Sequence, residues 1–160
     1  MSDVITNLPP KVRFSLRGPT ALDGTGDFSL PTRIGEIAVT GASVALCLGP
    51  DEWILEADDG AEAIAEAFAG SNTPHSLVEI SDRALSLKLT GPEALALLEM
   101  GCPRDLRTIP EGEAARTVCH GIEVILWHET DGWRVDAWRS FMPYLRGQLE
   151  HGVKELATGV

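Results

Sequence analysis

Segments in which apolar and polar residues alternate dominate this 160-residue chain. Residues 84–89, for example, place Leu85, Leu87 and Leu89 at every second position. A period of two is typical of a β-strand with one buried and one solvated face. Turn residues such as Gly49-Pro50-Asp51 separate these segments and are typical of hairpins. The chain is therefore expected to be rich in short strands joined by turns.

The order of the expected elements predicts the fold class. We expect strands at residues 11–16, two or three between 35 and 57, and further strands at 77–80, 84–89, 114–119, 122–128 and 133–138. Helices are expected at 61–69, at about 92–100 and from 141 onward, and a loop at 17–33. Because strands and helices do not alternate regularly, we predict an α+β fold of mainly antiparallel sheets with about three helices.

Residues with capping side chains mark the expected helix starts. Asp58-Asp59 offer N-cap oxygens to the first helix, Thr90 and Glu93 match a capping box for the second, and Ser140 can cap the third. Gly101 is expected to end the second helix in the left-handed conformation.

Two helices show apolar residues at helical spacing, and we expect these residues to pack on the sheets. They are Ile64 and Phe68 in the first helix and Phe141, Tyr144, Leu145 and Leu149 in the last.

The length of the chain bounds the number of domains. At 17.2 kDa, two independent cores would each be marginally stable. We expect one domain over residues 1–160, with its core at about residues 35–150, and an internal duplication stays open at this point.

Charge and cysteine usage exclude several functions. A formal net charge of −11 disfavours nucleic acid and anionic membranes as partners. The first ten residues lack a basic start followed by an apolar run, and no segment is apolar enough to span a membrane, so a cytoplasmic location is expected. The three cysteines are an odd number without a C-x-x-C pair, which predicts buried, reduced thiols.

Catalytic and cofactor motifs are weak in this sequence. No G-x-S-x-G elbow is present, and Cys119-His120 with His128 lack an obvious fourth metal ligand. Gly24-Thr25-Gly26 lacks the third glycine of a dinucleotide fingerprint, and the acidic groups Asp58-Asp59 and 111–113 suit caps and loops. From the residues alone we assign no catalytic residue, metal ligand or cofactor.

Three of the four tryptophans lie in one expected hairpin, where Arg134 and Arg139 stand beside two of them. Strand parity places Trp133 on one face and Trp138 with Arg134 on the other. Tryptophan and arginine are enriched at interface hot spots. Trp138, Arg134 and Arg139 are therefore the candidate interface residues, although cover of Trp138 by the chain's own loops stays open.

Several segments together resemble the gamma subunit family of heterotetrameric sarcosine oxidase. They are LGPDEWIL at 48–55, ISDR at 80–83, LTGPEA at 89–94, GCPRDL at 101–106, and WRSF at 138–141 with Tyr144-Leu145. The resemblance extends from about residue 42 to residue 149.

This resemblance implies both a fold and a role. The implied fold is a duplicated β-rich α+β unit, like the folate-binding domain of the glycine-cleavage aminomethyltransferase. The implied role is assembly without a catalytic residue. In such a complex the alpha and beta subunits hold FAD, FMN, NAD and tetrahydrofolate, the delta subunit binds zinc, and sarcosine is oxidatively demethylated to glycine.

Asp105 is the nearest counterpart of the catalytic aspartate of the aminomethyltransferase. However, Pro103-Arg104 replace the Thr-Asn that precedes that aspartate, and Arg116-Thr117 stand where Tyr-Thr is expected. A carboxylate without orienting neighbours lacks the positioning that proton transfer requires. Two alternatives stay open: a stand-alone folate-binding, aminomethyltransferase-like protein, and a gamma-like subunit of a complex that oxidises another N-methylated amino acid.

Overall fold

The computed structural model describes residues 4–19, 22 and 28–159. These residues form two compact units: unit 1 holds residues 4–9 and 82–159, and unit 2 holds Pro10–Ser81. Length led us to expect one core, whereas each unit has a hydrophobic cluster of its own. Whether the two units unfold as one domain stays a prediction. The Gly24-Thr25-Gly26 segment lies outside the described residues.

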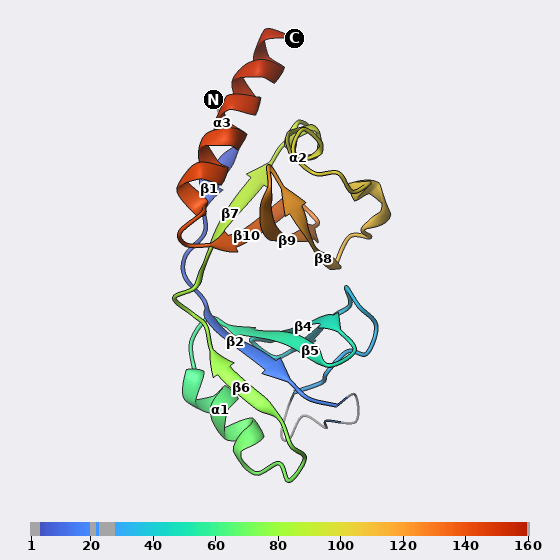
Figure 1. Cartoon of the computed structure of the whole chain (residues 1–160), viewed down its shortest axis with the longest axis vertical. Coiled ribbons are helices and arrows are strands. Elements are labelled where there is room, and N and C mark those ends of the chain that lie inside the picture. The colour runs from blue at the N-terminus through green and yellow to red at the C-terminus, as the bar shows by residue number, and fades with distance from the viewer. Residues whose placement is uncertain (1–3, 20–21, 23–27, 160) are drawn as a thin grey trace. The chain divides into compact units, whose positions relative to one another are not determined.

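Unit 2 is an antiparallel sheet with a helix beside β6 (Figure 1). Its described strands pair in the order β3-β4-β5-β2-β6. The elements are β2 (Val12–Arg17), β3 (Ile37–Thr40), β4 (Ser43–Gly49), β5 (Glu52–Ala57), α1 (Ala61–Ala69) and β6 (Ser76–Glu79). Leu16, Trp53 and Phe68 expose at most 1% of their surface, and burying a side chain of this size contributes about 1.5–3 kcal/mol.

Unit 1 is a second antiparallel sheet, with strand order β1-β7-β10-β9-β8 in its described part. The elements are β1 (Ile5–Asn7), β7 (Ala84–Thr90), α2 (Ala94–Glu99), the 3₁₀ helix η1 (Leu106–Thr108), β8 (Ala114–Cys119), β9 (Ile122–Glu129), β10 (Gly132–Trp138) and α3 (Met142–Thr158). The predicted hairpin between β9 and β10 is confirmed, but its two turn residues are Thr130 and Asp131, because Gly132 is the first residue of β10 and pairs directly with Glu129.

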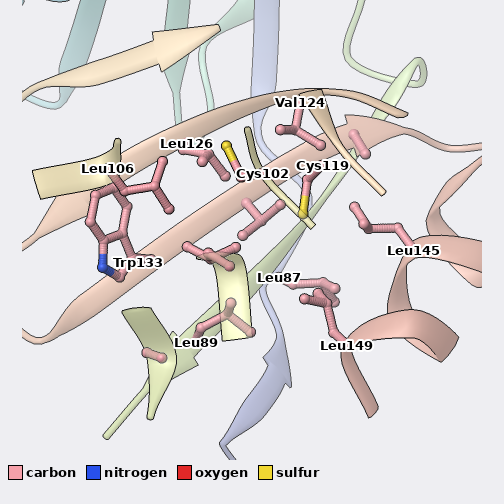
Figure 2. Close-up of a cluster of buried hydrophobic side chains, with 14 of the residues drawn as sticks. Leu87, Leu89, Cys102, Leu106, Cys119, Val124, Leu126, Trp133, Leu145 and Leu149 are labelled. Atoms are coloured by element: carbon pink, nitrogen blue, oxygen red, sulfur yellow. The ribbon is translucent and has the colours of Figure 1, made fainter. Parts of the chain in front are cut away.

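One face of the unit 1 sheet carries the core of the unit (Figure 2). Leu87 and Leu89 of β7 lie in one cluster with Leu126 of β9 and Trp133 of β10, and Leu145 and Leu149 of α3 belong to the same cluster. The alternation in β7 thus predicted the buried face correctly.

The two sheets have the same topology. Read from the edge, β8-β9-β10-β7-β1 corresponds to β3-β4-β5-β2-β6, and in both units three consecutive hairpin strands pair with the strand that precedes them. The units differ in the last edge strand, because β6 follows α1 whereas β1 comes from the N-terminal segment. Here the structure confirms the duplicated α+β unit.

The duplication extends to side chains on the central strands. Trp53 is the second residue of β5 and Trp133 the second residue of β10, and both are buried. Three residues further on, Glu56 and Asp136 occupy matching positions and are also buried. The equivalence then ends, since β5 is followed by Asp58 where β10 ends with Trp138.

The predicted positions of the helices are confirmed, but the predicted caps of α1 and α2 are wrong. The N-cap of α1 is Gly60, in the left-handed conformation with φ 85°, and no side chain caps this helix. The N-cap of α2 is Glu93 itself, so Thr90 and Glu93 do not form a capping box. The backbone supplies the partner instead, because the Ala94 amide donates to the Gly91 carbonyl at 3.2 Å.

The cap of α3 and the end of α2 also differ from expectation. Phe141, and not Ser140, is the N-cap of α3, and its amide donates to the Trp138 carbonyl at 2.9 Å. Gly101 does not adopt the left-handed conformation. A glycine is needed there because a Cβ would overlap the imidazole ring of His120.

Sequence alternation missed β1. This strand has only three residues, of which Ile5 alone is buried, and its pairing with β7 is visible only in the structure. No helix among the described residues is long and apolar enough to span a membrane.

Candidate interaction surface

Trp138, the last residue of β10, is half exposed. It exposes 51% of its surface, whereas Trp53, Trp127 and Trp133 expose between 1% and 5%. The parity prediction for Trp133 and Trp138 is confirmed, because Trp133 lies in the unit 1 core. A large aromatic side chain in contact with water has apolar area that a partner can still cover.

Two further aromatic residues lie just after Trp138. Phe141 exposes 47% and Tyr144 exposes 50% of its surface. Phe141 follows Trp138 through a tight turn closed by their backbone hydrogen bond, and Tyr144 lies one helical turn later. The Tyr144 hydroxyl lies 3.4 Å from the His120 carbonyl oxygen, to which it donates.

The sequence had assigned Phe141 and Tyr144 to the core, and this assignment is wrong. The buried stripe of α3 consists instead of Met142, Leu145, Leu149 and Gly152. These residues follow helical spacing, so Phe141 and Tyr144 fall on the neighbouring face of the helix. Counting Met142 as the first member of the stripe would have given the correct answer from sequence.

Two arginines border the exposed aromatic residues. The Cζ atom of Arg83 lies 5.9 Å from the centroid of the Trp138 ring, within the range of a cation–π contact. Arg139 donates through Nε to the Asp82 carbonyl at 2.9 Å. Its amide donates to the Arg83 carbonyl at 2.7 Å, which ties the end of β10 to the start of β7.

We call Arg83, Trp138, Arg139, Phe141 and Tyr144 the junction surface, because they gather where β10 passes into α3. All five residues are exposed. Within the part of the chain that the structure describes, neither Arg83 nor Arg139 forms an ion pair with a carboxylate.

Arg134, the third candidate interface residue, is not part of the junction surface. It is 4% exposed, and its guanidinium binds Asp136 through Nε at 2.8 Å and Nη2 at 2.7 Å. The guanidinium also lies over the Trp127 ring, 4.4 Å from its centroid, and Trp127 Nε1 donates to Asp136 Oδ2 at 2.7 Å. The structure therefore brings Trp138 and Arg139 together and places Arg134 in a buried polar cluster.

Asp105 serves as the N-cap of η1. Its Oδ1 accepts hydrogen bonds from the Arg107 side chain at 2.9 Å and the Arg107 amide at 3.1 Å. These hydrogen bonds with Arg107 hold the pKa of the Asp105 carboxyl below its ordinary value. A carboxylate with a lowered pKa is a weak base. The Asp105 carboxylate is also exposed to solvent and already hydrogen-bonded to Arg107.

The cysteine and histidine residues considered as metal ligands have structural contacts. Burial, followed by the charge of Cys102, raises the pKa of the Cys119 thiol to about 12. The His128 ring stacks on Trp133 with centroids 4.3 Å apart, and its Nδ1 lies 2.7 Å from the Ile109 carbonyl oxygen. Among the described residues, no three His, Cys, Asp or Glu side chains converge on a common metal position.

An ion cluster stands at the end of the β9–β10 hairpin. The Lys88 ammonium, mostly buried on β7, binds both Glu129 and Asp131. Burial alone would lower the pKa of Lys88, but the hydrogen bonds that Lys88 donates to Asp131 and Glu129 outweigh burial and raise that pKa. The hydrogen bond from Lys88 correspondingly lowers the pKa of Asp131.

Comparison with solved structures defines the class of the fold. No family model matches the chain. A chain of the heterotetrameric sarcosine oxidase from Corynebacterium sp. U-96, in complex with pyrrole 2-carboxylate, superposes with a TM-score of 0.83 and 27% identity, covering 94% of this chain and 83% of that chain. Aminomethyltransferase T of the glycine cleavage system from Bartonella henselae gives a TM-score of 0.70 at 15% identity, covering 91% of this chain and 44% of that chain. The chain therefore shares its fold with aminomethyltransferase T as well as with the sarcosine oxidase chain.

Sequence relatives narrow this class. Sarcosine oxidase subunit gamma of Corynebacterium sp. strain P-1 is 32% identical over 156 residues, which cover 88% of this chain and 76% of that protein. The gamma subunit of Corynebacterium sp. strain U-96 is 34% identical over 148 residues, which cover 88% of this chain and 71% of that protein. The Arthrobacter sp. gamma subunit is 35% identical over 108 residues, which cover 65% of this chain and 52% of that protein. The chain belongs to the sarcosine oxidase gamma subunit family.

Proposed function

We propose that this chain is the non-catalytic gamma subunit of a heterotetrameric sarcosine oxidase, a complex that oxidatively demethylates sarcosine to glycine. The observation that carries the proposal is the likeness to a chain of the Corynebacterium complex over 94% of the sequence at a TM-score of 0.83. Its partners are then the alpha, beta and delta subunits, and its location is the cytoplasm.

The proposal places the reactive groups outside this chain. FAD, FMN, NAD and tetrahydrofolate are held by the alpha and beta subunits and zinc by the delta subunit. The described side chains support this division: Asp105 is an exposed, ion-paired cap, and the Cys119 thiol has a pKa of about 12. An exposed carboxylate that is already ion-paired is poorly suited to proton transfer. A thiol that stays protonated near neutral pH is poorly suited to nucleophilic attack.

Co-purification tests this proposal. We expect an affinity-tagged chain, expressed with the sarcosine oxidase flavoprotein subunits of its source, to recover them in a fixed ratio with the visible absorbance of bound flavin. Recovery of the chain without a flavoprotein would overturn the assignment. A panel of N-methylated amino acids, supplied to the recovered complex, identifies its substrate and tests sarcosine against the alternative that another N-methylated amino acid is oxidised.

A second candidate function is tetrahydrofolate binding by the isolated chain. The fold shared with aminomethyltransferase T favours it. The engagement of Asp105 by Arg107 weighs against it, because the carboxylate is occupied by its own cap. Calorimetric titration of the purified chain with tetrahydrofolate separates the two functions: we expect no saturable heat, and micromolar binding would favour the second candidate.

A further inference from the structure

We propose that the junction surface is the site at which a partner subunit docks, and that the partner supplies an apolar side chain flanked by carboxylates. This inference rests on the proposed function, because it assumes that the chain works inside a complex. It replaces the interface of Trp138, Arg134 and Arg139 with a surface centred on Trp138 and bordered by Arg83 and Arg139.

The exposure of three neighbouring aromatic residues is the first support. Trp138, Phe141 and Tyr144 each leave about half of their surface uncovered, at 51%, 47% and 50%. In the described part of unit 2 the large apolar residues that are exposed are all aliphatic, namely Ile34, Val39 and Val78. Aromatic side chains with arginines beside them are the composition of interface hot spots.

The duplicated fold supplies an internal control. At the equivalent strand-to-helix junction of unit 2 the chain reads Ala57-Asp58-Asp59-Gly60, with no aromatic or basic residue. The fold therefore does not require a tryptophan or an arginine at this place. The aromatic and basic residues at 138–141 of unit 1 are therefore not explained by the needs of the fold, and we attribute them to binding.

Charge identifies the chemistry of the partner. The chain holds twenty-four acidic and thirteen basic residues, and several described arginines, such as Arg17 and Arg146, pair with its own carboxylates. Arg83 and Arg139 do not, within the described residues. Two guanidinium groups without a described carboxylate partner, one of them over the exposed indole ring and the other next to it in sequence, suit carboxylates carried by another chain.

Acidic residues of this chain also border the surface. Asp82 precedes Arg83, and Glu123 is the residue of β9 next to Val124, which pairs with Ala137. Neither carboxylate forms an ion pair with Arg83 or Arg139. These carboxylates and the net charge of −11 repel an acidic partner at a distance. The partner's carboxylates must therefore approach the guanidinium groups closely, which favours a defined acidic segment over a diffuse acidic surface.

A second copy of this chain fits the surface poorly. A twofold dimer through the junction surface would set the same patch against itself, since such interfaces are isologous. Arg83 and Arg139 of one copy would then face Arg83 and Arg139 of the other, and like charges across an interface are unfavourable. The occupant we infer is therefore a different subunit.

Competition during assembly tests the docking site. Two copies of the chain with different tags, one wild-type and one variant, are expressed together with the flavoprotein subunits, and the ratio of the two in the purified complex is measured. For Trp138→Ala we expect incorporation to fall by about 30-fold, the effect of a hot-spot tryptophan. For Arg83→Glu combined with Arg139→Glu we expect a fall of about tenfold that diminishes as salt is raised.

Matched controls carry the same kinds of change elsewhere. Val39→Ala removes exposed apolar surface from β3, and Arg104→Glu reverses an exposed charge in unit 1. Both should be incorporated within about twofold of wild type, as surface changes outside a hot spot usually are. Thermal unfolding of each purified variant confirms that the variant is folded.

The outcomes separate the two proposals. If the wild-type chain enters no flavoprotein complex, the proposed function fails and the docking site fails with it. If the wild type enters the complex and the junction variants compete equally well, the docking site is wrong while the function stands. If the isolated chain dimerises and Trp138→Ala abolishes the dimer, the occupant is a second copy and our choice of a different subunit is overturned.

Discussion

Units 1 and 2 share one topology and differ in the residues that come directly after the central strand. β5 and β10 both carry a buried tryptophan at the second position and a buried acidic residue at the fifth. After them, unit 2 continues with Asp58-Asp59 and unit 1 with Trp138-Arg139. The buried positions therefore carry the same type of residue in both units, whereas the exposed positions that follow carry different types.

This difference shows where binding can evolve in a duplicated fold. A buried position such as Trp53 or Trp133 is constrained by close packing, because even one methylene of changed volume is felt. The residue after the strand has no such constraint, so Asp58 in one unit and Trp138 in the other are both compatible with the fold. The comparison therefore separates residues that maintain the structure from residues free to contact a partner.

The most demanding prediction asks whether the two units open together. A variant that retains only Cys47 reports on unit 2, and one that retains only Cys119 reports on unit 1, since both thiols are buried. If the chain is one cooperative domain, both thiols should react about 1000-fold or more slowly than in the unfolded chain, as expected for a global stability of about 5 kcal/mol or more.

The measurement is the rate of labelling with a disulfide-exchange reagent at mildly alkaline pH. Burial raises the pKa of both thiols, so intrinsic reactivity in the folded state is low in either case. Equal protection of Cys47 and Cys119 is the predicted result. Rapid labelling of Cys47 while Cys119 stays protected would show that unit 2 opens independently.

Gly132→Ala should be the most destabilising single substitution of a glycine in unit 1. Gly132 has φ 142°, and a Cβ there would overlap the Leu89 carbonyl oxygen. The expected cost is about 3 kcal/mol or more, from backbone strain and overpacking together. Denaturant unfolding measures it. Gly147→Ala, in an open position on α3, is the control and should stabilise the protein by about 0.5–1 kcal/mol. A loss below about 1 kcal/mol for Gly132→Ala would contradict the predicted strain.

Exchanging the junction residues tests the comparison of the two units directly. Trp138→Asp with Arg139→Asp gives unit 1 the residues that unit 2 has at the equivalent positions. We expect folding stability to change by about 1 kcal/mol at most, because both side chains are exposed. Incorporation into the flavoprotein complex should fall by about 30-fold or more in the competition assay. A variant that loses stability heavily would show that Trp138 is a structural residue after all.

Much of the fold followed from local signals. Alternation in β7 and the Asp131-Gly132 dipeptide predicted the sheet and a hairpin, because side-chain period and turn chemistry are local properties. The caps failed because Glu93 and Phe141 enter their helices through backbone turns, which leave no side-chain signature. β1 failed because a three-residue edge strand is defined by its partner, β7.

The candidate site was predicted only in part. Strand parity placed Trp138 on the face away from the core, but the burial of Arg134 and its contact with Asp136, two residues along the same strand face, were not foreseen. A basic and an acidic residue at this spacing on one face is a readable signal for an internal pair. Phe141 and Tyr144 were missed because the buried stripe begins at Met142, which only the true helix start reveals.

The smallest predicted effect concerns the Lys88 cluster, whose counterpart at the β4–β5 hairpin of unit 2 is the more exposed ion pairing of Arg17 with Asp51 and Glu52. The pKa of Asp131 is lowered, so its contribution to stability is present above its ordinary pKa of 3.8 and is lost as pH falls through its folded value. The pKa of Lys88 is raised, so its contribution is lost as pH rises beyond 10.5.

Lys88→Met should therefore lower the melting temperature slightly at neutral pH, and the difference from wild type should shrink at both extremes of pH. Thermal unfolding followed by circular dichroism over a series of pH values measures this. Lys154→Met, an exposed lysine with no described ion pair, serves as the control and should show no such pH dependence. A constant difference at every pH would mean that Lys88 acts through packing alone.

Hydroxyl-radical footprinting of the free chain and of the assembled complex, read by mass spectrometry, tests the central claim most directly. We predict that oxidation of Trp138, Phe141 and Tyr144 falls at least about tenfold on assembly, as expected where an interface excludes water, while Val39 and Val78 stay as reactive as in the free chain. Unchanged oxidation of Trp138 in a complex that contains the chain would contradict the assignment of the junction surface as its binding site.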